Sequence, residues 1–363
     1  MGYGRYVLFR LANMFVVLIL VTVISAALFY AAGEAFLWDL VMSHVNAEVS
    51  AYRQQYPTAT EEEIRRFKQE REKFWMDYYG LTKPLWERVL TTTWNLMTFN
   101  FGKALQLRTP GGSDKVIDLI LDRLPNTILL FTVGDLITMA IGIYLGMKAA
   151  KNVGSLLDRA ISTFAMVTYS LPMWWTGMLM IMVFSYYIPN PFNPYEGLFP
   201  SGGILSPEVP PDPFLRFLDF LWHLTLPVTT LVLVSFGGWA YATRNIVLGT
   251  LQQDFVMAAR AKGLPERKVL YGHVLRASSP AIATSVILSV IGSLGGAMIS
   301  ETVFNWPGMG NLAWMAIANM DFPVLLGWMY VTTLIWLLTL IVIDLIYGLL
   351  DPRVKVGIAV KGT

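Results

Sequence analysis

The chain has 363 residues, of which 55% are hydrophobic and only 14% are charged, and its mean hydropathy is +0.52. Soluble globular domains carry about 25% charged residues, so this composition excludes an ordinary soluble domain and indicates an integral membrane protein. The net charge of +2 does not support nucleic-acid binding, and the absence of cysteine excludes disulfides, thiol catalysis and cysteine-ligated metals.

Hydropathy predicts an all-α membrane protein. A helix needs about 20 apolar residues to cross a hydrocarbon core of roughly 30 Å. Six stretches meet this length, at about 9–32, 124–149, 159–188, 223–249, 278–302 and 323–350. The first is too long for the apolar region of a signal peptide, and we interpret it as a permanent helix.

A polar excursion, 33–123, separates the first two spans and is predicted to form a small external helical cap. Thr60 and Glu63 have the spacing of a capping box ahead of an amphipathic helix, and Gly80 is placed to end that helix. A second helix, from about Pro84 to Met97, is expected to bury Leu85, Val89 and Leu90. The cap is interpreted as a structural element, with a docking surface for an external partner as the alternative.

The second external segment is the loop 189–222, whose first half is rich in proline, glycine and aromatic residues. Because proline fixes φ and removes a hydrogen-bond donor, an ordered irregular loop is expected there. A stiff connection is favoured over a lid.

Lysine and arginine in the short loops indicate the orientation. Fourteen lie on one side: Arg5, Arg10, Lys148, Lys151, Arg159, Arg244, Arg260, Lys262, Arg267, Lys268, Arg276, Arg353, Lys355 and Lys361. The opposite short loops, 189–222 and 303–322, hold Arg216 alone. The predicted organisation is therefore a cytoplasmic start and first span (1–32), the cap (33–123), a permeation core (124–350) with a cytoplasmic loop at 250–277, and a cytoplasmic tail (351–363).

The sequence contains no catalytic or nucleotide-binding motif. The histidines His44, His223 and His273 are scattered over opposite faces, and no metal-protease, nucleophile-elbow or P-loop pattern occurs. We therefore expect no catalytic residue, metal site or bound cofactor. Any nucleotide energy must reach this chain through a partner.

A few polar or small residues inside the spans are candidates for a transport pathway. Asp135 lies near the middle of the second span, and an ionisable residue there suggests function, although a structural hydrogen bond is the alternative. The pairs Gly237–Gly238 and Gly295–Gly296 allow close helix packing and also helix plasticity. The scarcity of internal charge argues against a proton- or sodium-coupled carrier.

The stretch AARAKGLPERK (258–268) places a small-residue helix, a glycine break and a basic cluster in the cytoplasmic loop. It resembles the cytoplasmic EAA loop of ABC-importer permeases, with Met257 in the place of the glutamate. Six segments, in the same order along the chain, resemble the dipeptide/oligopeptide branch of that family: YGLTKPLWERV (79–89), RLPNTILL (123–130), YSLPMWWTGM (169–178), ETVFNWPGMG (301–310), DFPVLLG (321–327) and DLIYGLLDPR (344–353). The excursion around 40–75 departs from the branch's pattern.

The resemblance implies a type I ABC-importer permease in a plasma or inner membrane. It implies two cytoplasmic ATPases that bind ATP and magnesium, an external substrate-binding protein, a second homologous permease, and transport by alternating access. The expected ATPase-coupling residues are Ala258, Ala259, Arg260, Ala261, Lys262, Gly263, Leu264, Arg267, His273 and Arg276. Leu264 is expected to anchor in the ATPase.

Other functions remain as alternatives to peptide import. An oligosaccharide importer would use the same framework. A membrane-embedded enzyme would need paired acids or a Ser/His/Asp set at one membrane depth. A passive channel would have no use for a partner-docking loop.

Overall fold

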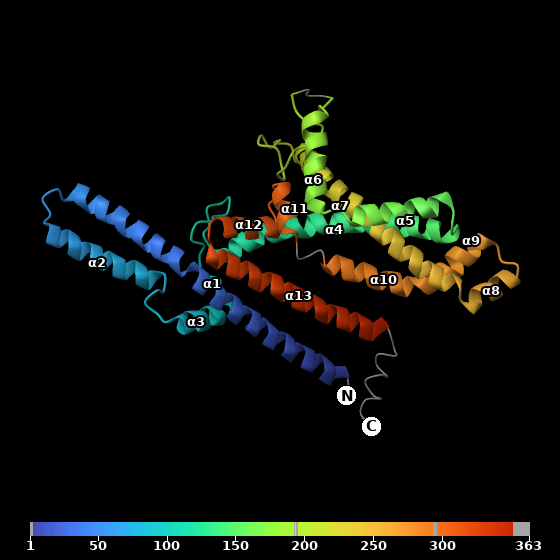
Figure 1. Ribbon diagram of the computed structural model, residues 1–363, viewed down its shortest axis with the longest axis horizontal. Coiled ribbons are helices and arrows are strands. Elements are labelled where there is room, and N and C mark those ends of the chain that lie inside the picture. Colours follow the sequence, from blue (N-terminus) through green and yellow to red (C-terminus); the bar gives the residue numbers. More distant parts are fainter. Residues whose placement is uncertain (1–2, 192, 194, 293–295, 351–363) are drawn as a thin grey trace. The chain divides into compact units, whose positions relative to one another are not determined.

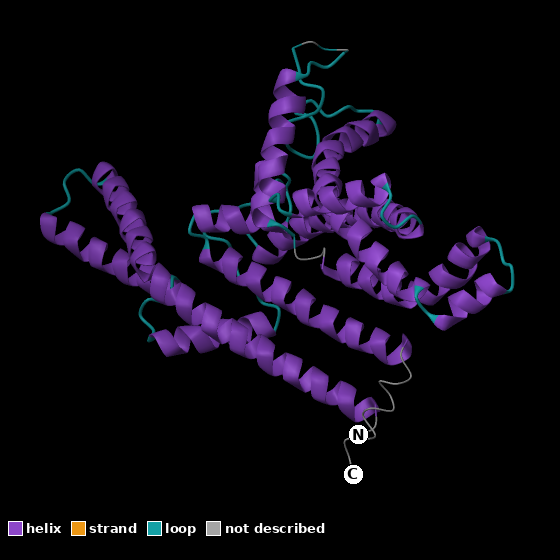
Figure 2. Cartoon of the chain, turned by 45° about the vertical axis from the view of Figure 1, so that its right-hand side comes forward, coloured by secondary structure: helices purple, strands orange, loops and turns teal. Residues whose placement is uncertain are grey.

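The computed structural model describes residues 3–191, 193, 195–292 and 296–350, which form helices joined by loops (Figure 1, Figure 2). The chain divides into two compact units. The N-terminal unit comprises Gly4–Ile120 and Met315–Leu337. The central unit comprises Leu121–Trp314 and the described part of Leu338–Thr363.

The N-terminal unit begins with α1 (Tyr3–Gln55), a single helix of 53 residues. Apolar residues dominate only as far as about residue 32, but the helix continues because 33–55 contains no proline to interrupt its hydrogen bonds. The first predicted span and the beginning of the predicted cap are therefore one element. The boundary at residue 32 is a change of polarity and not a break in the helix.

Helix α2 (Glu61–Tyr78) folds back beside the distal part of α1 (Figure 1). Its predicted capping box is confirmed: the Glu63 amide donates to Thr60 Oγ1 at 3.3 Å, and the Thr60 amide donates to the Glu63 carboxylate at 2.8 Å. Shortly after its end, Gly80 adopts φ +72°, which favours glycine.

Aromatic stacking joins the α1–α2 hairpin along its length. The rings of Tyr52 and Phe67 stack with centroids 4.4 Å apart, and those of His44 and Trp75 stack at 4.1 Å. These ring pairs remove large apolar surfaces from water and so stabilise the hairpin.

Helix α3 (Leu85–Met97) lies against α1 and runs in the opposite direction. Arg88 Nη2 donates to Glu34 Oε2 at 2.9 Å. The prediction for its apolar residues is right for Val89, which is buried, and wrong for Leu85 and Leu90, which are 40% and 56% exposed. The face that carries Arg88 and Val89 turns toward α1, and Leu90 lies about 100° further round the helix.

Asp321, immediately before α13 (Phe322–Leu350), ties the loop after α3 to that helix. Its carboxylate is fully buried and accepts backbone N–H groups of Leu105 at 3.1 Å, Gln106 at 2.8 Å and Leu107 at 2.9 Å. Three charge-assisted hydrogen bonds compensate for the burial of the carboxylate. The N-terminal unit is thus closed by a residue more than 200 positions away in sequence.

The central unit is built on α4 (Val116–Lys151), α5 (Leu156–Tyr169) and α7 (Pro213–Leu251). Glycines allow these helices to approach closely. A Cβ at Gly146 of α4 would lie 2.7 Å from Thr243 Cβ of α7, and one at Gly237 of α7 would lie 2.7 Å from Ala165 Cα of α5. Packing is therefore sufficient reason for glycine at both positions.

The predicted span 159–188 is not one continuous helix. It consists of α5, α6 (Met173–Ile181) and the π-helical η1 (Met182–Tyr187), and the chain bends by 94° between α5 and α6. Pro172 stands at the break. Its ring disfavours a helical Leu171, and it lacks the N–H that would continue the ladder.

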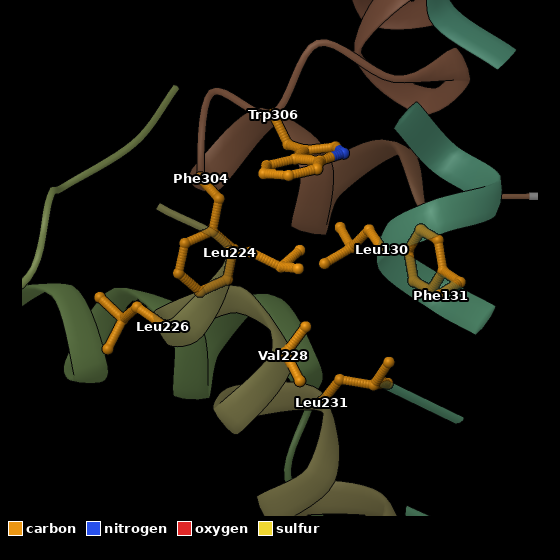
Figure 3. Packing of buried hydrophobic residues seen from close by; sticks show 8 residues of the cluster. All are labelled: Leu130, Phe131, Leu224, Leu226, Val228, Leu231, Phe304 and Trp306. Carbon is orange, nitrogen blue, oxygen red and sulfur yellow. The ribbon is translucent and has the colours of Figure 1, made fainter. Parts of the chain in front are cut away.

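The last part of the central unit contains α10 (Leu275–Gly292), α11 (Met298–Val303) and the start of α12 (Met309–Ala318). The loop between α11 and α12 contributes Trp306, together with Phe304, to a hydrophobic core cluster (Figure 3). The other buried members come from α4 and α7: Leu130, Phe131, Leu224, Leu226, Val228 and Leu231.

Four described helices are long and apolar enough to cross a membrane, within Val7–Gln55, Val116–Lys151, Pro213–Leu251 and Phe322–Ile343. The bent pair raises the number to five if it forms one crossing. Of the six predicted spans, 278–302 contains no single helix of this kind among the described residues, in which α10 covers Leu275–Gly292.

Candidate functional site

The segment 250–277 forms three short helical pieces at the end of α7. They are α8 (Asp254–Ala261), α9 (Glu266–Lys268) and η2 (Val269–Val274). Helix α8 ends at Ala261, and the predicted glycine break follows at Gly263, which has φ +75° and donates its N–H to the Arg260 carbonyl at 2.9 Å. Glycine at this position permits the left-handed turn that reverses the chain.

One face of this loop packs on the ends of the long helices. Val256 and Ala259 of α8 join a buried cluster with Met147 of α4 and Val247 of α7. Leu264, expected to anchor in a partner, is half-buried and packs against this same cluster. These contacts fix α8 to the ends of α4 and α7, because a packed core is not freely deformable.

The other face of α8 is exposed and mostly apolar. Phe255 and Met257 are 40% and 59% exposed, and Ala258 and Ala261 are also exposed. In the sequence, Met257 stands out only as a departure from a motif, and no pattern marks Phe255. Val256, Ala259 and Gly263 recur at a spacing of three to four residues, which places them on one side of the helix. This spacing indicates the buried face of α8, so the remaining residues form its exposed face.

Charge at the loop is partly paired internally. Arg260 Nη2 donates to Glu266 Oε1 at 2.7 Å, and this hydrogen bond holds the pKa of the Glu266 carboxyl below its usual value. The other predicted basic residues of the loop are exposed: Lys262, Arg267, His273 and Arg276. The structure therefore brings the predicted coupling residues together in one loop but divides them between an inner and an outer face.

The candidate pathway residues have different surroundings. Asp135 of α4 is half-buried, and the Ser289 hydroxyl of α10 donates to its Oδ2 at 3.4 Å. Gly237 is a packing contact, whereas Gly238 faces an open pocket. Gly296 adopts φ +69° beside Glu301, and Gly295 lies outside the described residues.

Two of the histidines have structural contacts. His44 stacks on Trp75, and His223 Nδ1 lies 2.9 Å from the Asp219 carbonyl oxygen. Within the described residues, no group of three or more histidine or acidic side chains is placed to hold a metal ion.

Comparison with known proteins places this arrangement among membrane transport components. Residues 140–356, which include the whole of the 250–277 loop, match the family described as the binding-protein-dependent transport system inner membrane component. The oligopeptide transport system permease protein AppB of Bacillus subtilis is 31% identical over 289 residues, covering 79% of this chain and 85% of that protein.

Two further relatives show similar coverage. The dipeptide transport system permease protein DppB of Escherichia coli is 30% identical over 287 residues, covering 76% of this chain and 83% of that protein. The peptidoglycan transport system permease protein YejB of Agrobacterium fabrum is 33% identical over 286 residues, covering 76% and 73%.

Proposed function

Since this chain belongs to the family of inner-membrane components of binding-protein-dependent transport systems, as a permease of the peptide branch of ABC importers, we propose that it forms the pathway by which short peptides enter the cell. As a permease subunit it is not itself an enzyme. The substrates for which the three relatives are named, an oligopeptide, a dipeptide and peptidoglycan, share a peptide component and support this substrate class.

The proposal includes six membrane crossings with both termini in the cytoplasm. Helix α10 together with α11 makes the crossing that length and hydropathy alone do not assign. The excess of lysine and arginine on one side supports the orientation and places the 250–277 loop in the cytoplasm. The distal α1–α2 hairpin and α3 then form the external cap.

The observation that supports the mechanism is that α8 has one exposed apolar face and one buried face. Its exposed residues Phe255, Met257 and Ala258 offer an apolar surface to an ATPase subunit, while Val256 and Ala259 fix the helix to α4 and α7. ATP and magnesium are held by the ATPases. When the ATPases close, they move α8 together with the helices on which it packs. The membrane helices then alternate between outward-open and inward-open arrangements.

The remaining partners follow from this mechanism. A substrate-binding protein delivers the peptide at the outer face, and a second, homologous permease completes the pathway. The polar pathway residue contributed by this chain is Asp135, with Gly238 and Gly296 permitting helix movement.

Uptake by the complete transporter in proteoliposomes tests the substrate class. The panel is a di- or tripeptide, a peptidoglycan fragment that carries a peptide, and an oligosaccharide without one. We expect the binding protein and the peptide-bearing substrates to stimulate ATP hydrolysis and uptake. Uptake of the plain oligosaccharide alone would reject the peptide proposal in favour of the sugar importer.

A substitution in the loop tests the coupling role separately. Gly263→Trp places a side chain at φ +75°, which is strained for any L-residue other than glycine. We expect the variant to insert in the membrane and to lose uptake while the ATPases retain basal hydrolysis. Wild-type uptake by this variant would contradict the coupling role of the loop.

A further inference from the structure

Asp135 is an ionisable residue that accepts a long, weak hydrogen bond from its neighbour Ser289. It lies near the middle of α4, and the hydrogen bond that it accepts from Ser289 Oγ is 3.4 Å long. No lysine, arginine or histidine among the described residues forms an ion pair with it. A carboxylate within a membrane span is costly to bury, and a pairing cation from a ligand would reduce that cost.

An open pocket lies close to this carboxylate along α10. It has a volume of about 460 Å³ and is lined by residues that include Thr168, Tyr169, Ser235, Trp239 and Ser285. Ser285 and Ser289 are four residues apart on α10 and so lie on the same side of the helix, one turn from each other. The hydroxyls of α10 therefore connect the pocket to Asp135.

The lining of the pocket suits a small, amphipathic ligand. Tyr169 and Trp239 supply aromatic surface, while Thr168, Ser235 and Ser285 supply hydroxyls. The volume falls within the range of roughly 300–1,000 Å³ that is typical of ligand pockets, which combine apolar walls with a few polar groups.

We propose that Asp135 and Ser289 bind the α-ammonium group of a peptide in transit, and that the adjoining pocket holds its first residue. This inference rests on the proposed peptide function and adds the site that recognises the substrate's positive end. The ammonium offers three donors, which match a carboxylate and a serine hydroxyl. The site receives the one charge that every peptide with a free amino terminus carries, whatever its side chains.

The absence of cysteine from this chain allows a direct test of access and charge. In the assembled transporter, Ser289→Cys is treated with a trimethylammonium-bearing methanethiosulfonate and with a neutral reagent of similar size, and labelling is read as the mass of this subunit. We expect labelling in at least one nucleotide state, with the cationic reagent about tenfold faster because of the neighbouring carboxylate. Adding Asp135→Asn should remove that preference, and the peptide substrate should slow labelling.

Uptake measurements test recognition of the amine itself. Asp135→Asn should raise the KM for a free-amine peptide by about tenfold or more, as expected for loss of a charge-assisted hydrogen bond, while Asp135→Glu should recover most of the affinity. Glu62→Gln, on the exposed side of α2, is the matched charge-removal control and should transport normally.

The outcomes separate this inference from the proposed function. If the wild type transports the peptide and Asp135→Asn does so with unchanged KM, or if Ser289→Cys is never labelled, the ammonium site is wrong and the peptide importer stands. If the wild type transports only oligosaccharides, the peptide proposal and this inference both fail. If Asp135→Asn does not assemble, labelling of Ser289→Cys in the presence of native Asp135 decides the question. Faster labelling by the cationic reagent and slower labelling in the presence of peptide would support the site, and the absence of both would reject it.

Discussion

Glu301 is fully buried. The groups around its carboxylate give a physical reason for the residues of the segment 301–310, which the sequence pattern alone did not provide. Thr127 Oγ1 donates to Glu301 Oε1 at 3.0 Å, and the Asn311 amide donates to Oε2 at 3.0 Å. The Thr127 hydroxyl in turn accepts the Met309 amide at 2.7 Å. Gly308 leaves the space in which these groups meet, so the motif ETVFNWPGMG encodes a buried polar network between α4 and the α11–α12 turn.

Gly308→Ala is the first prediction at the scale of single residues. Its Cβ would collide with both the Glu301 carboxylate and the Thr127 hydroxyl. We expect a loss of about 1–3 kcal/mol of stability, measured as a lower thermal unfolding midpoint in detergent, because overpacking displaces the network. Gly249→Ala is the control, since nothing lies within 4 Å of its Cβ. Equal midpoints for the two variants would show that the network is not constrained in this way.

The ion pair between α5 and α7 gives a second residue-scale prediction. Asp158 is 3% exposed. Its carboxylate accepts a hydrogen bond from Arg244 Nη2 at 2.9 Å and another from the Gly154 amide at 2.8 Å. Removal of the carboxylate leaves the Arg244 guanidinium, whose side chain is 17% exposed, without its ionic partner, so Asp158→Ala should cost about 3 kcal/mol or more. Glu70→Ala breaks the exposed pair with Arg66 and should cost less than about 0.5 kcal/mol. Comparable thermal shifts would contradict a structural role for Asp158.

At the scale of elements, the sequence predicted where helices lie better than which way they face. Hydropathy located the long spans, and the spacing of AARAKGLPERK located the break at Gly263. The 94° bend after Tyr169 was signalled by Pro172 but was hidden by the continuous apolar run around it. The faces of α3 and α8 were not predictable, because short amphipathic patterns do not say which neighbour will cover them.

The two faces of α8 lead to opposite outcomes for adjacent alanines. Ala258→Trp adds bulk to the exposed face and should uncouple ATP hydrolysis from uptake without lowering the thermal midpoint. Ala259 is 6% exposed inside the cluster with Met147 and Val247, so Ala259→Trp should lower stability by at least about 1–3 kcal/mol. Thermal unfolding and ATPase-coupled uptake measured side by side distinguish the two. The same phenotype from both variants would argue against the assigned faces.

At the scale of the whole molecule, the division into units differs from the division by hydropathy. The sequence separated an apolar first helix, a polar cap and a membrane core, because polarity is what hydropathy measures. The structure instead groups all of α1 after Tyr3 with α2, α3 and the residues Met315–Leu337. The long-range contact that closes this unit, from Asp321 to Leu105–Leu107, could not be predicted, because no local pattern pairs positions so far apart.

This closure gives a prediction about the N-terminal unit as a whole. Asp321→Asn keeps the size of the side chain but replaces one acceptor oxygen with a donor group and removes the charge, which leaves at least one of the three backbone amides, of which that of Leu107 is buried, without its partner. Each such loss costs about 1–3 kcal/mol. Hydrogen exchange at the amides of Leu105, Gln106 and Leu107 should therefore accelerate by about tenfold or more, and exchange at the start of α13 should follow it.

Asp114→Asn is the control, since that carboxylate has an exposed partner in Lys103. Unchanged exchange in the Asp321 variant would mean that the loop is held by its apolar contacts, including the buried Leu107, and that the unit does not depend on the carboxylate.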